Sequence, residues 1–481
     1  MAFGNVTGAA SLDQSALIST FDIDMPEVRN RLLAPYGDQF VSEFHLMEDL
    51  GYTRGVAQDS VRQYEEDWIS QPVYVGSGGI TDAGSGVYTF VLNVNSPTNS
   101  FLATSAVSPY TAATYKTPVR INDRLWLQGD EGFVQFQVKN VAGSHPTVTV
   151  TMEISDTSKS ITVGDYPAGT AIMIGDNVWA EGTGQPTGIV NKPYSDYAYL
   201  QICKENFGVT GTQMTNQAWF TMADFGGDLG RRYFIKGQFN AEYKAKKQRF
   251  LAMMFGQVTT AMMDTGVNEP YISTEGHIEY ATRRGSVLPY VNGSWSPLML
   301  DVYNKTLDSL NAPGKYMIAC GSDLSNQIDN ALKSYLQFTP ADYIIDGMND
   351  SLFGGDKGKA VSVGFKYIEK GGRTFAKKTF RSWSDASTLG LSGYKTPGLG
   401  WIAPLGFTKD TRVNEARPFF GMVYKELDGY SRKYELWNRR GAGGNPGQYI
   451  LAEDLAYLDI RQHFGAEHFG GQLQIVTPLA A

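Results

Sequence analysis

The residues best suited to metal binding and proton transfer are few and widely spaced in this sequence. Its five histidines are His45, His145, His277, His463 and His468. The closest polar pairs are His277 with Glu279 and His463 with His468, and neither has the His-Glu-x-x-His spacing of a zinc protease helix. We therefore predict no metal site and expect surface or hydrogen-bonded histidines.

The two cysteines, Cys203 and Cys320, are too few for a four-ligand zinc site or a disulfide framework. Both lie in apolar runs typical of strands, where a thiol behaves as a small buried hydrophobic group. No Gly-x-Ser-x-Gly nucleophile motif occurs, and neither cysteine has a histidine near it in the sequence. We interpret both as inert thiols of a protein made in a reducing compartment.

Two other segments match catalytic motifs only in part. Gly354–Lys359 has the glycines and lysines of a phosphate-binding loop, but Phe353 stands where that motif needs its first glycine. We predict a turn with solvated lysines there. Glu65–Asp67 could supply the paired carboxylates of a glycosidase, yet adjacent side chains on a helix point apart. The sequence thus predicts no catalytic, cofactor-binding or metal-binding residues, and no cofactor.

Charge is distributed unevenly along the chain. Residues 1–70 hold twelve acids and four bases, which accounts for the whole net charge of -8. Basic residues gather at 231–249 and at 366–381, and the second cluster has six bases against one acid. Either cluster could meet phosphate or the acidic arm of another subunit, and we favour contact between subunits. A solvated helix face is the alternative interpretation of the acidic arm.

The composition excludes several protein classes. An apolar share of 42% and an aromatic share of 12% argue against a mainly disordered chain. No run of eighteen apolar residues and no secretory leader is recognisable, so we expect a soluble protein. The balanced charge of residues 71–481 argues against general nucleic-acid binding, which needs a basic face. The 53 glycines show no period, and with 27 tyrosines and 25 phenylalanines they favour a β-rich chain with many turns.

The elements expected along the chain change in type near residue 71. Before it we predict helices from Asp24 to about Tyr36, over 40–50 and over 56–69. After it, alternating patterns predict strands at 87–94, 124–128, 133–138 and 147–152. Together these strands suggest a small antiparallel β unit at about 110–185, flanked by glycine-rich loops at 76–79 and 182–184.

Residues 228–255 form one long predicted helix of about 42 Å. Its apolar stripe is thin, which is typical of a helix lying along a sheet or shell, and consists of Leu229, Tyr233, Tyr243, Leu251 and Met254.

An α/β segment follows residue 270. We predict a helix capped by Ser296 and a second capped by Asp323, with a buried strand at 316–320 between them. Further strands are expected near 342–346, 361–368 and 419–425, completing one sheet, with a last one at 472–476.

Several short motifs precede the long helix, and one follows a later strand. They are Ala168-Gly169-Thr170, Glu181-Gly182, Tyr199–Lys204, Val209–Gln213 and Gly321–Leu324. In this order the sequence resembles the major capsid proteins of tailed double-stranded DNA bacteriophages with the Hong Kong 97-type capsid fold. The resemblance covers roughly residues 60–481 in layout. The acidic helical opening is also similar to coat proteins of crAss-like phages.

The resemblance implies an α+β capsid fold with a peripheral domain, a long spine helix, an axial domain and an extended hairpin loop that carries the inserted β domain. The implied regions are an N-terminal arm at 1–70, the extended loop at 71–200 with its insertion at about 110–185, the peripheral domain at 201–270 with the spine helix at 228–255, the axial domain at 271–430, and a return to the core at 431–481.

The function expected from this resemblance is that of a virion structural protein. It would assemble with itself into hexamers and pentamers of an icosahedral shell around phage DNA, without enzymatic activity. The implied partners are neighbouring capsomers, portal and auxiliary or decoration proteins, and DNA bound non-specifically, with no membrane. Synthesis in the host bacterial cytoplasm is implied. The alternatives are another phage structural or carbohydrate-binding tail protein, or a β-rich hydrolase acting through carboxylates.

Overall fold

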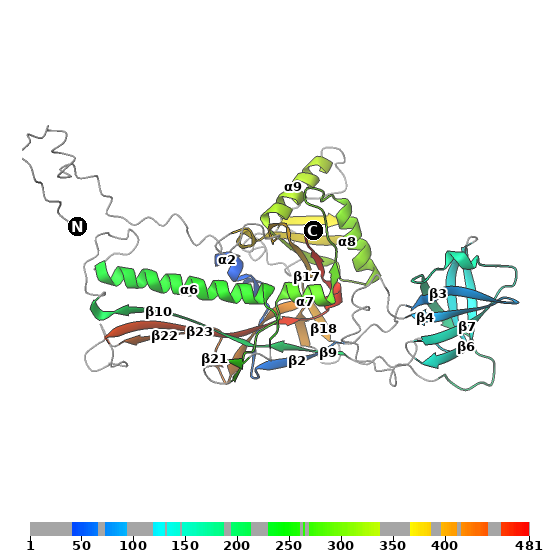
Figure 1. Cartoon of the computed structure of the whole chain (residues 1–481), viewed down its shortest axis with the longest axis horizontal. Helices are drawn as coiled ribbons and strands as arrows, with labels where there is room; N and C mark the ends of the chain where they lie inside the picture. The colour runs from blue at the N-terminus through cyan, green and yellow to red at the C-terminus, as the bar shows by residue number, and fades with distance from the viewer. Residues whose placement is uncertain are drawn as a thin grey trace, which may run out of the picture. The chain divides into compact units, whose positions relative to one another are not determined.

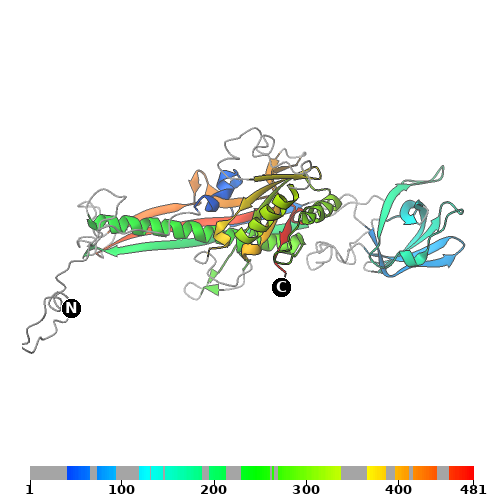
Figure 2. The ribbon, with the colours of Figure 1, turned by 90° about the horizontal axis from the view of Figure 1, so that it is seen from above.

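The computed structural model of the chain describes thirteen stretches of residues (Figures 1 and 2). They are 41–65, 73–93, 119–129, 132–144, 147–186, 194–212, 229–259, 263–264, 269–336, 366–385, 396–410, 415–440 and 454–480. The chain divides into two compact units. Unit 1 includes Lys204–Ala245 and Leu436–Ile460, and unit 2 consists of Phe40–Cys203, Lys246–Glu435 and Arg461–Ala481. Helices and strands are both abundant, so the predicted α+β class is confirmed.

A closed β-barrel lies in unit 2, with its strands joined in the order β3-β4-β7-β6-β5-β8. The strands are β3 (Val73–Gly84), β4 (Val87–Asn93), β5 (Asp123–Gly129), β6 (Gly132–Ser144), β7 (Thr147–Ile154) and β8 (Ala171–Asn177). Alternate side chains point inward, and Leu125, Phe136 and Val138 are fully buried. Closure gives the barrel a hydrophobic core of its own. The four strands predicted within 87–152 are confirmed.

The boundary predicted for this β unit at about residue 110 is wrong, because β3 and β4 belong to the barrel. The predicted glycine-rich loop at 76–79 is also wrong, because it lies inside β3. There the pairing with β4 shifts register between Val75 and Ile80. Gly78 and Gly79 have φ of 101° and 73°, which only glycine adopts readily, so the glycines form a bulge that bends the strand.

A two-stranded ribbon brackets the barrel along the chain. It pairs β2 (Ser60–Glu65) with β9 (Tyr194–Tyr199) in antiparallel register, with Ser60 opposite Tyr199. The barrel is therefore an insertion between two paired strands. Just before the ribbon, β1 (Thr53–Val56) pairs in parallel with β20 (Phe420–Leu427). The helix predicted over 56–69 is wrong, because pairing with distant strands overrides the local helical pattern.

The helix predicted over 40–50 is confirmed as two short helices, α2 (Val41–Phe44) and α3 (Leu46–Asp49). Phe44, Met47 and Leu50 are buried, as the pattern predicted. With β1 and β2, these helices make residues 41–65 an integral part of unit 2. The N-terminal arm predicted at 1–70 is therefore too long. The helix predicted from Asp24 lies outside the described residues.

Unit 1 contains most of the long helix α6 (Leu229–Phe255), which confirms the helix predicted over 228–255. It lies along β10 (Gln201–Thr210) and β23 (Leu455–His468), and β22 (Glu435–Arg440) also pairs with β23 (Figure 1). Small residues four apart, Gly237, Ala241 and Ala245, form its buried face there. A Cβ atom at position 237 would collide with the ring of Phe207, so glycine lets the helix approach the sheet closely.

The apolar stripe predicted for this helix is only partly correct. Met254 is buried, but Tyr243 and Leu251 are half-buried. The side chains of Leu229 and Tyr233 lie outside the described ones. The buried face was missed because glycine and alanine carry little hydrophobic signal.

A six-stranded sheet in unit 2 has the order β13-β24-β17-β14-β16-β15. Its strands are β13 (Ser286–Val287), β24 (Ile475–Thr477), β17 (Gly400–Pro404), β14 (Lys315–Cys320), β16 (Arg373–Thr379) and β15 (Lys366–Lys370). Two helices, α8 (Leu298–Ser309) and α9 (Ser322–Leu336), share a hydrophobic core with it through residues such as Tyr303 and Ile328.

Both helices and the strand at 316–320 were predicted, but the predicted caps are wrong. Pro297 is the N-cap of α8 and makes no side-chain cap hydrogen bond, and Asp323 lies inside the first turn of α9. The strands expected near 361–368 and 472–476 correspond in part to β15 and β24. The strand at 419–425 exists as β20, but it pairs with β1 and β23 rather than completing this sheet. The strand predicted near 342–346 lies outside the described residues.

The remaining elements are short. They are α7 (His277–Arg284), β11 (Met263–Asp264), β12 (Glu269–Pro270), β18 (Phe407–Asp410), β19 (Glu415–Pro418), β21 (Tyr430–Ser431) and the 3-10 turns η2 (Val163–Asp165), η3 (Arg381–Trp383), η4 (Thr396–Gly398) and η5 (Gly471–Leu473). Among the described residues, no helix is both long enough and apolar enough to cross a membrane.

Candidate functional site

The basic cluster at 366–381 is largely neutralised inside the chain. Three of its bases pair with acids of α8 and α9, and these pairs are Lys370–Asp301 (2.9 Å), Arg373–Asp308 and Lys377–Asp329. Lys377 is 3% exposed, which leaves it no surface for a partner. The hypothesis that this cluster meets phosphate or another subunit's acidic arm therefore fails at these three positions.

Acids of the N-terminal segment are also held within the chain. The buried Glu43 carboxylate accepts the backbone N–H groups of Arg381 at 2.8 Å and Ser382 at 3.1 Å. These groups open the turn η3, whose first N–H groups have no partner inside the turn itself. Asp59 binds Lys425 at 2.6 Å. We therefore drop the idea that these acids seek a basic surface elsewhere.

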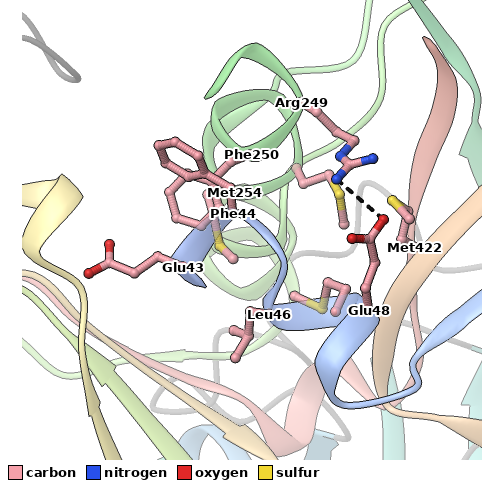
Figure 3. Close-up of a pocket in the computed structure, with 10 residues that line it drawn as sticks. Glu43, Phe44, Leu46, Glu48, Arg249, Phe250, Met254 and Met422 are labelled. Atoms are coloured by element: carbon pink, nitrogen blue, oxygen red, sulfur yellow. Dashed lines mark ion pairs between the residues drawn. The ribbon is translucent and has the colours of Figure 1, made fainter. Parts of the chain in front are cut away.

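Glu48 is the centre of the strongest ionic cluster in this segment. Its carboxylate lies 3.3 Å from Arg249 of α6 (Figure 3). It also lies 2.9 Å from Lys433 and contacts His45. Burial alone would raise the pKa of Glu48, but the hydrogen bond from His45 and the charges of Arg249 and Lys433 lower it to about 2. Glu48 thus ties α3 to α6 and to the turn after β21.

A small pocket lies beside this cluster, between α2–α3 and the C-terminal part of α6 (Figure 3). Four methionines belong to its lining, together with aromatic and ionic side chains. The lining residues are Glu43, Phe44, Leu46, Met47, Glu48, Arg249, Phe250, Met253, Met254 and Met422. Methionine side chains are flexible and polarizable, so this contact can adjust to small movements of the helix.

The other basic cluster, at 231–249, is divided between two environments. Arg249 is buried against Glu48, as described. Lys244 is mostly exposed and lies 3.8 Å from Glu205 within unit 1. A surface pair of this kind contributes little to stability.

Two histidines far apart in the sequence meet inside unit 2. The Nδ1 atoms of His277 and His468 lie 3.1 Å apart, and both side chains are buried. His277 stacks on Trp401 of β17, and His468 stacks on Tyr280. We call His277, His468, Tyr280 and Trp401 the junction cluster, because they connect α7 and β17 to the end of β23. The sequence pairs of His277 with Glu279 and of His463 with His468 gave no signal for it.

The other candidate residues do not form a catalytic group. Glu48 binds His45, His463 lies 3.7 Å from Asp59, and His145 is outside the described residues. Burial raises the pKa of the Cys320 thiol to about 12 and also raises that of Cys203, which disfavours a thiolate at either position. Within the described stretches, no group of three or more histidine, cysteine or acidic side chains could hold a metal ion.

Glu65 is the one member of the predicted carboxylate run that the structure describes; Glu66, Asp67 and Gly354–Lys359 lie outside the described residues. Its carboxylate accepts the Gly470 N–H at 3.0 Å and the Tyr280 hydroxyl at 3.4 Å. Burial raises its pKa to about 7, although the Gly470 hydrogen bond opposes the shift.

One face of the β2–β9 ribbon exposes aromatic side chains. Tyr64 is 61% exposed and Tyr197 is 42% exposed. The guanidinium of Arg62 lies 5.0 Å from the ring centre of Tyr64 and 5.4 Å from that of Tyr197. Tyr197 also stacks on Tyr199, at 6.0 Å between ring centres. Tyrosine and arginine are the residues that dominate the binding energy of protein interfaces, and we call these four residues the ribbon face.

A second exposed apolar group lies on the outside of the barrel. Phe133 is 58% exposed and Met173 is 52% exposed. Trp126 lies between them, directly opposite Met173 and 6.3 Å from the Phe133 ring. We call Phe133, Trp126 and Met173 the barrel face; they belong to the three neighbouring strands β6, β5 and β8.

Comparisons with known proteins gave similar structures but no relative by sequence. No family model and no curated protein matches the chain. The structure is similar to that of Gordonia phage Cozz, with 10% identity, a TM-score of 0.37 and coverage of 100% of this chain and 99% of that one. The capsid of cyanophage P-SCSP1u has 12% identity and a TM-score of 0.33 over 64% and 81% of the two chains. The SrpI encapsulin of Synechococcus elongatus has 10% identity and a TM-score of 0.31 over 60% and 75%.

Proposed function

We propose that this chain is a structural shell protein: a major capsid protein with the Hong Kong 97-type fold, which assembles into hexamers and pentamers of an icosahedral shell around double-stranded phage DNA. Its role is structural rather than enzymatic. Burial raises the pKa of both the Cys203 and the Cys320 thiol, so neither supplies a thiolate nucleophile near neutral pH.

The observation that carries this proposal is the ribbon face. A two-stranded ribbon can bury neither face by itself, and isolated ribbons are marginally stable in water. Here the inner face is covered, with Gln63 and Ala198 buried, while Tyr64 and Tyr197 on the outer face remain exposed. Repeated contacts between identical chains would cover this face in every subunit of a shell.

The long helix supports the same conclusion. Its outer side exposes Phe239 at 52% and the charged Lys244, so part of this helix presents both an aromatic ring and a charge to a neighbouring subunit. Large interfaces of about 2,000 Å² or more are typical of permanent assemblies. We include in this proposal neighbouring capsomers, portal and auxiliary proteins, non-specific contact with packaged DNA, and synthesis in the bacterial cytoplasm. An origin in a crAss-like phage stays a prediction.

The decisive experiment expresses the full chain and examines it by negative-stain microscopy and light scattering. We expect rings or closed shells from the wild type. The double variant Tyr64→Ala with Tyr197→Ala should remain folded but stay unassembled, because it removes the aromatic area of the ribbon face. The control, Tyr64→Phe with Tyr197→Phe, keeps both rings and should assemble. Normal shells from the alanine variant would refute the role of the ribbon face, and a wild type that stays monomeric at all concentrations would refute the shell function.

The barrel face favours a second candidate, binding of a carbohydrate by a phage structural protein. Exposed Phe133 and Met173 beside Trp126, with Gln128 and Gln135 on the neighbouring outward positions, could contact a sugar ring. Trp fluorescence titrated with oligosaccharides tests it, and the expected signal change should disappear in Phe133→Ser. The same fluorescence in the presence and absence of sugar would exclude this candidate.

A further inference from the structure

The junction cluster fixes the proton positions on its two histidines. His468 Nε2 lies 3.1 Å from the backbone oxygen of Glu275, and a carbonyl oxygen can only accept, so Nε2 carries the hydrogen. In the neutral ring Nδ1 of His468 is then an acceptor. His277 Nδ1 must therefore donate to it across 3.1 Å. Only one proton fits between the two rings.

The second nitrogen of His277 is enclosed by apolar groups. The His277 ring is stacked on Trp401 and meets Phe420 edge-on at 5.8 Å. No described residue offers a hydrogen bond to its Nε2 atom, which is buried. A proton added to His277 Nε2 would create a charged imidazolium among apolar side chains. A proton added to His468 Nδ1 would make two N–H donors, one from each ring, face each other. Either addition breaks the arrangement.

We propose that the junction cluster is an acid-sensitive latch: the neutral His277–His468 pair holds α7 and β17 against the end of β23, and acidification loosens this contact. The latch connects members of two different sheets, because Trp401 belongs to β17 whereas Phe420 and His468 belong to β20 and β23. This inference concerns the single chain and does not depend on the proposed shell function.

The charges around the latch do not cancel its response. Charged and titratable groups from four elements pack near it. On the ribbon they are Glu65 (β2) and Asp196 (β9), and on and just before α7 they are Glu275, Tyr280, Arg283 and Arg284. On β23 the group is Glu467, which pairs with Arg54 and Arg417. Arg283 binds both Glu275 at 2.8 Å and Asp196 at 2.9 Å, so these acids are engaged with arginine. Burial lowers the pKa of His277 well below 6.5, helped by the neighbouring His468, and burial lowers that of His468 although Glu275 opposes it.

The sign of the effect follows from these directions. Unfolded histidine titrates near 6.5, so stability is fully present above this pH and falls as the pH falls below it. Glu65 acts in the opposite direction. Its pKa of about 7 lies above the unfolded value of 4.5, so its contribution to stability is greatest below pH 4.5 and is lost as the pH rises to 7. Glu65 therefore moderates the latch in the same pH range.

The first test observes the wild-type chain, unassembled, by NMR with nitrogen-15-labelled histidine. We expect at pH 7.5 one buried ring with its hydrogen on Nδ1 and another with its hydrogen on Nε2, hydrogen-bonded to each other. Neither should titrate between pH 7.5 and 6. Two rings in the same tautomer, or two rings that titrate near 6.5 in the folded chain, would overturn the proposal.

The second test uses variants that retain hydrogen bonding. His277→Asn places an amide donor near the position of Nδ1, and His468→Gln keeps a donor for Glu275, but neither can take up a proton. From the pH dependence of urea unfolding near pH 5.5, the double variant should take up about two fewer protons on unfolding than the wild type. The Glu65→Gln variant should take up about one more proton on unfolding than the wild type, because Glu65 itself releases a proton when the wild type unfolds. The control, His463→Gln, lies outside the cluster, and its proton uptake on unfolding should fall by at most about one proton.

Hydrogen exchange shows whether the contact opens. The Ala466 N–H donates to Thr274 at 2.8 Å, and the Gly470 N–H donates to Glu65, so both amides report on the end of β23. Between pH 7.5 and 5, their protection should fall about tenfold or more relative to barrel amides in the wild type, but not in the double variant. Equal protection at both pH values in the wild type would refute the latch.

Discussion

The barrel and the ribbon are both antiparallel sheets, but they differ in what completes them. The barrel closes on itself: β3 pairs with β8, and inward residues such as Phe136 form a private core. The ribbon has only two strands, so it packs one face on other parts of unit 2 and leaves Tyr64 and Tyr197 exposed on the other. A closed sheet needs nothing from a neighbour, whereas an open one needs a surface to lie on.

The largest difference between the two regions should appear when each is removed in turn. Deleting residues 1–65 removes β1 and β2, leaves β9 without its partner and exposes the edge of β20 that β1 covers, and should prevent unit 2 from folding. Replacing residues 73–177 with a short linker should leave a folded chain, because the barrel carries its own core. Circular dichroism and a cooperative urea transition measure the outcome, with a 1–40 deletion as the control that keeps every described element. A cooperative transition in the 1–65 deletion would show that the two regions do not differ in this way.

A core substitution tests whether the barrel is energetically separate. Phe136→Ala removes a fully buried ring and should destabilise the barrel by about 3–5 kcal/mol. Phe133→Ala on the same strand removes an exposed ring and should change stability by less than about 0.5 kcal/mol. Native-state hydrogen exchange locates the loss. Exchange that rises equally throughout unit 2 would argue for one cooperative core.

The segment that leads into the ribbon should respond to acid through Glu48. Its pKa is about 2 in the folded chain and 4.5 as the ordinary value, so its contribution is present above pH 4.5 and is lost as the pH falls towards 2. Glu48→Gln should cost about 1–2 kcal/mol at pH 7, less than the full pKa shift would give because solvent partly screens this carboxylate, and flatten this dependence. Glu205→Gln, which affects a surface pair, should cost about 0.5 kcal/mol or less. Urea unfolding from pH 2 to 7 compares them, and parallel curves for wild type and Glu48→Gln would contradict the assignment.

The smallest effect on folding is expected at Arg62. Arg62→Ala removes its contacts with the rings of Tyr64 and Tyr197 and should cost about 0.5 kcal/mol of folding free energy, because the site is exposed. If the ribbon face is an interface, the same variant should weaken assembly far more than folding. Sedimentation velocity and thermal unfolding of the same samples measure the two effects. A larger loss in folding than in assembly would indicate that the face serves the monomer alone.

Regular elements with strong local patterns could be predicted from the sequence. The alternating strands at 87–94 and 147–152 and the helix at 228–255 are found as expected. The strands at 53–65 could not be predicted, because they form by pairing with distant strands at 194–199 and 422–425. Strand β23 was missed for a related reason: its second half is buried on both sides, so it no longer alternates.

The polar clusters were harder to predict than the fold. The His277–His468 contact joins residues 191 positions apart, and the sequence near either histidine does not predict the other as its partner. The basic run at 366–381 suggested a partner, yet acids on α8 and α9 at Asp301 and Asp329 face it in the folded chain. Sequence shows which charges exist, but only the arrangement of helices on a sheet shows which of them are already paired.

The neighbouring first and last strands of the barrel have a consequence for the order of folding. Pairing β2 with β9 directly requires closing a loop that spans residues 66–193, and the entropy lost grows with the length of the flexible chain. Once β3 has met β8, the two ends of the insertion are held close together, and the length of chain still to be closed falls to residues 66–72 and 178–193. The barrel should therefore form first as the chain leaves the ribosome, and the ribbon should close afterwards at little further cost.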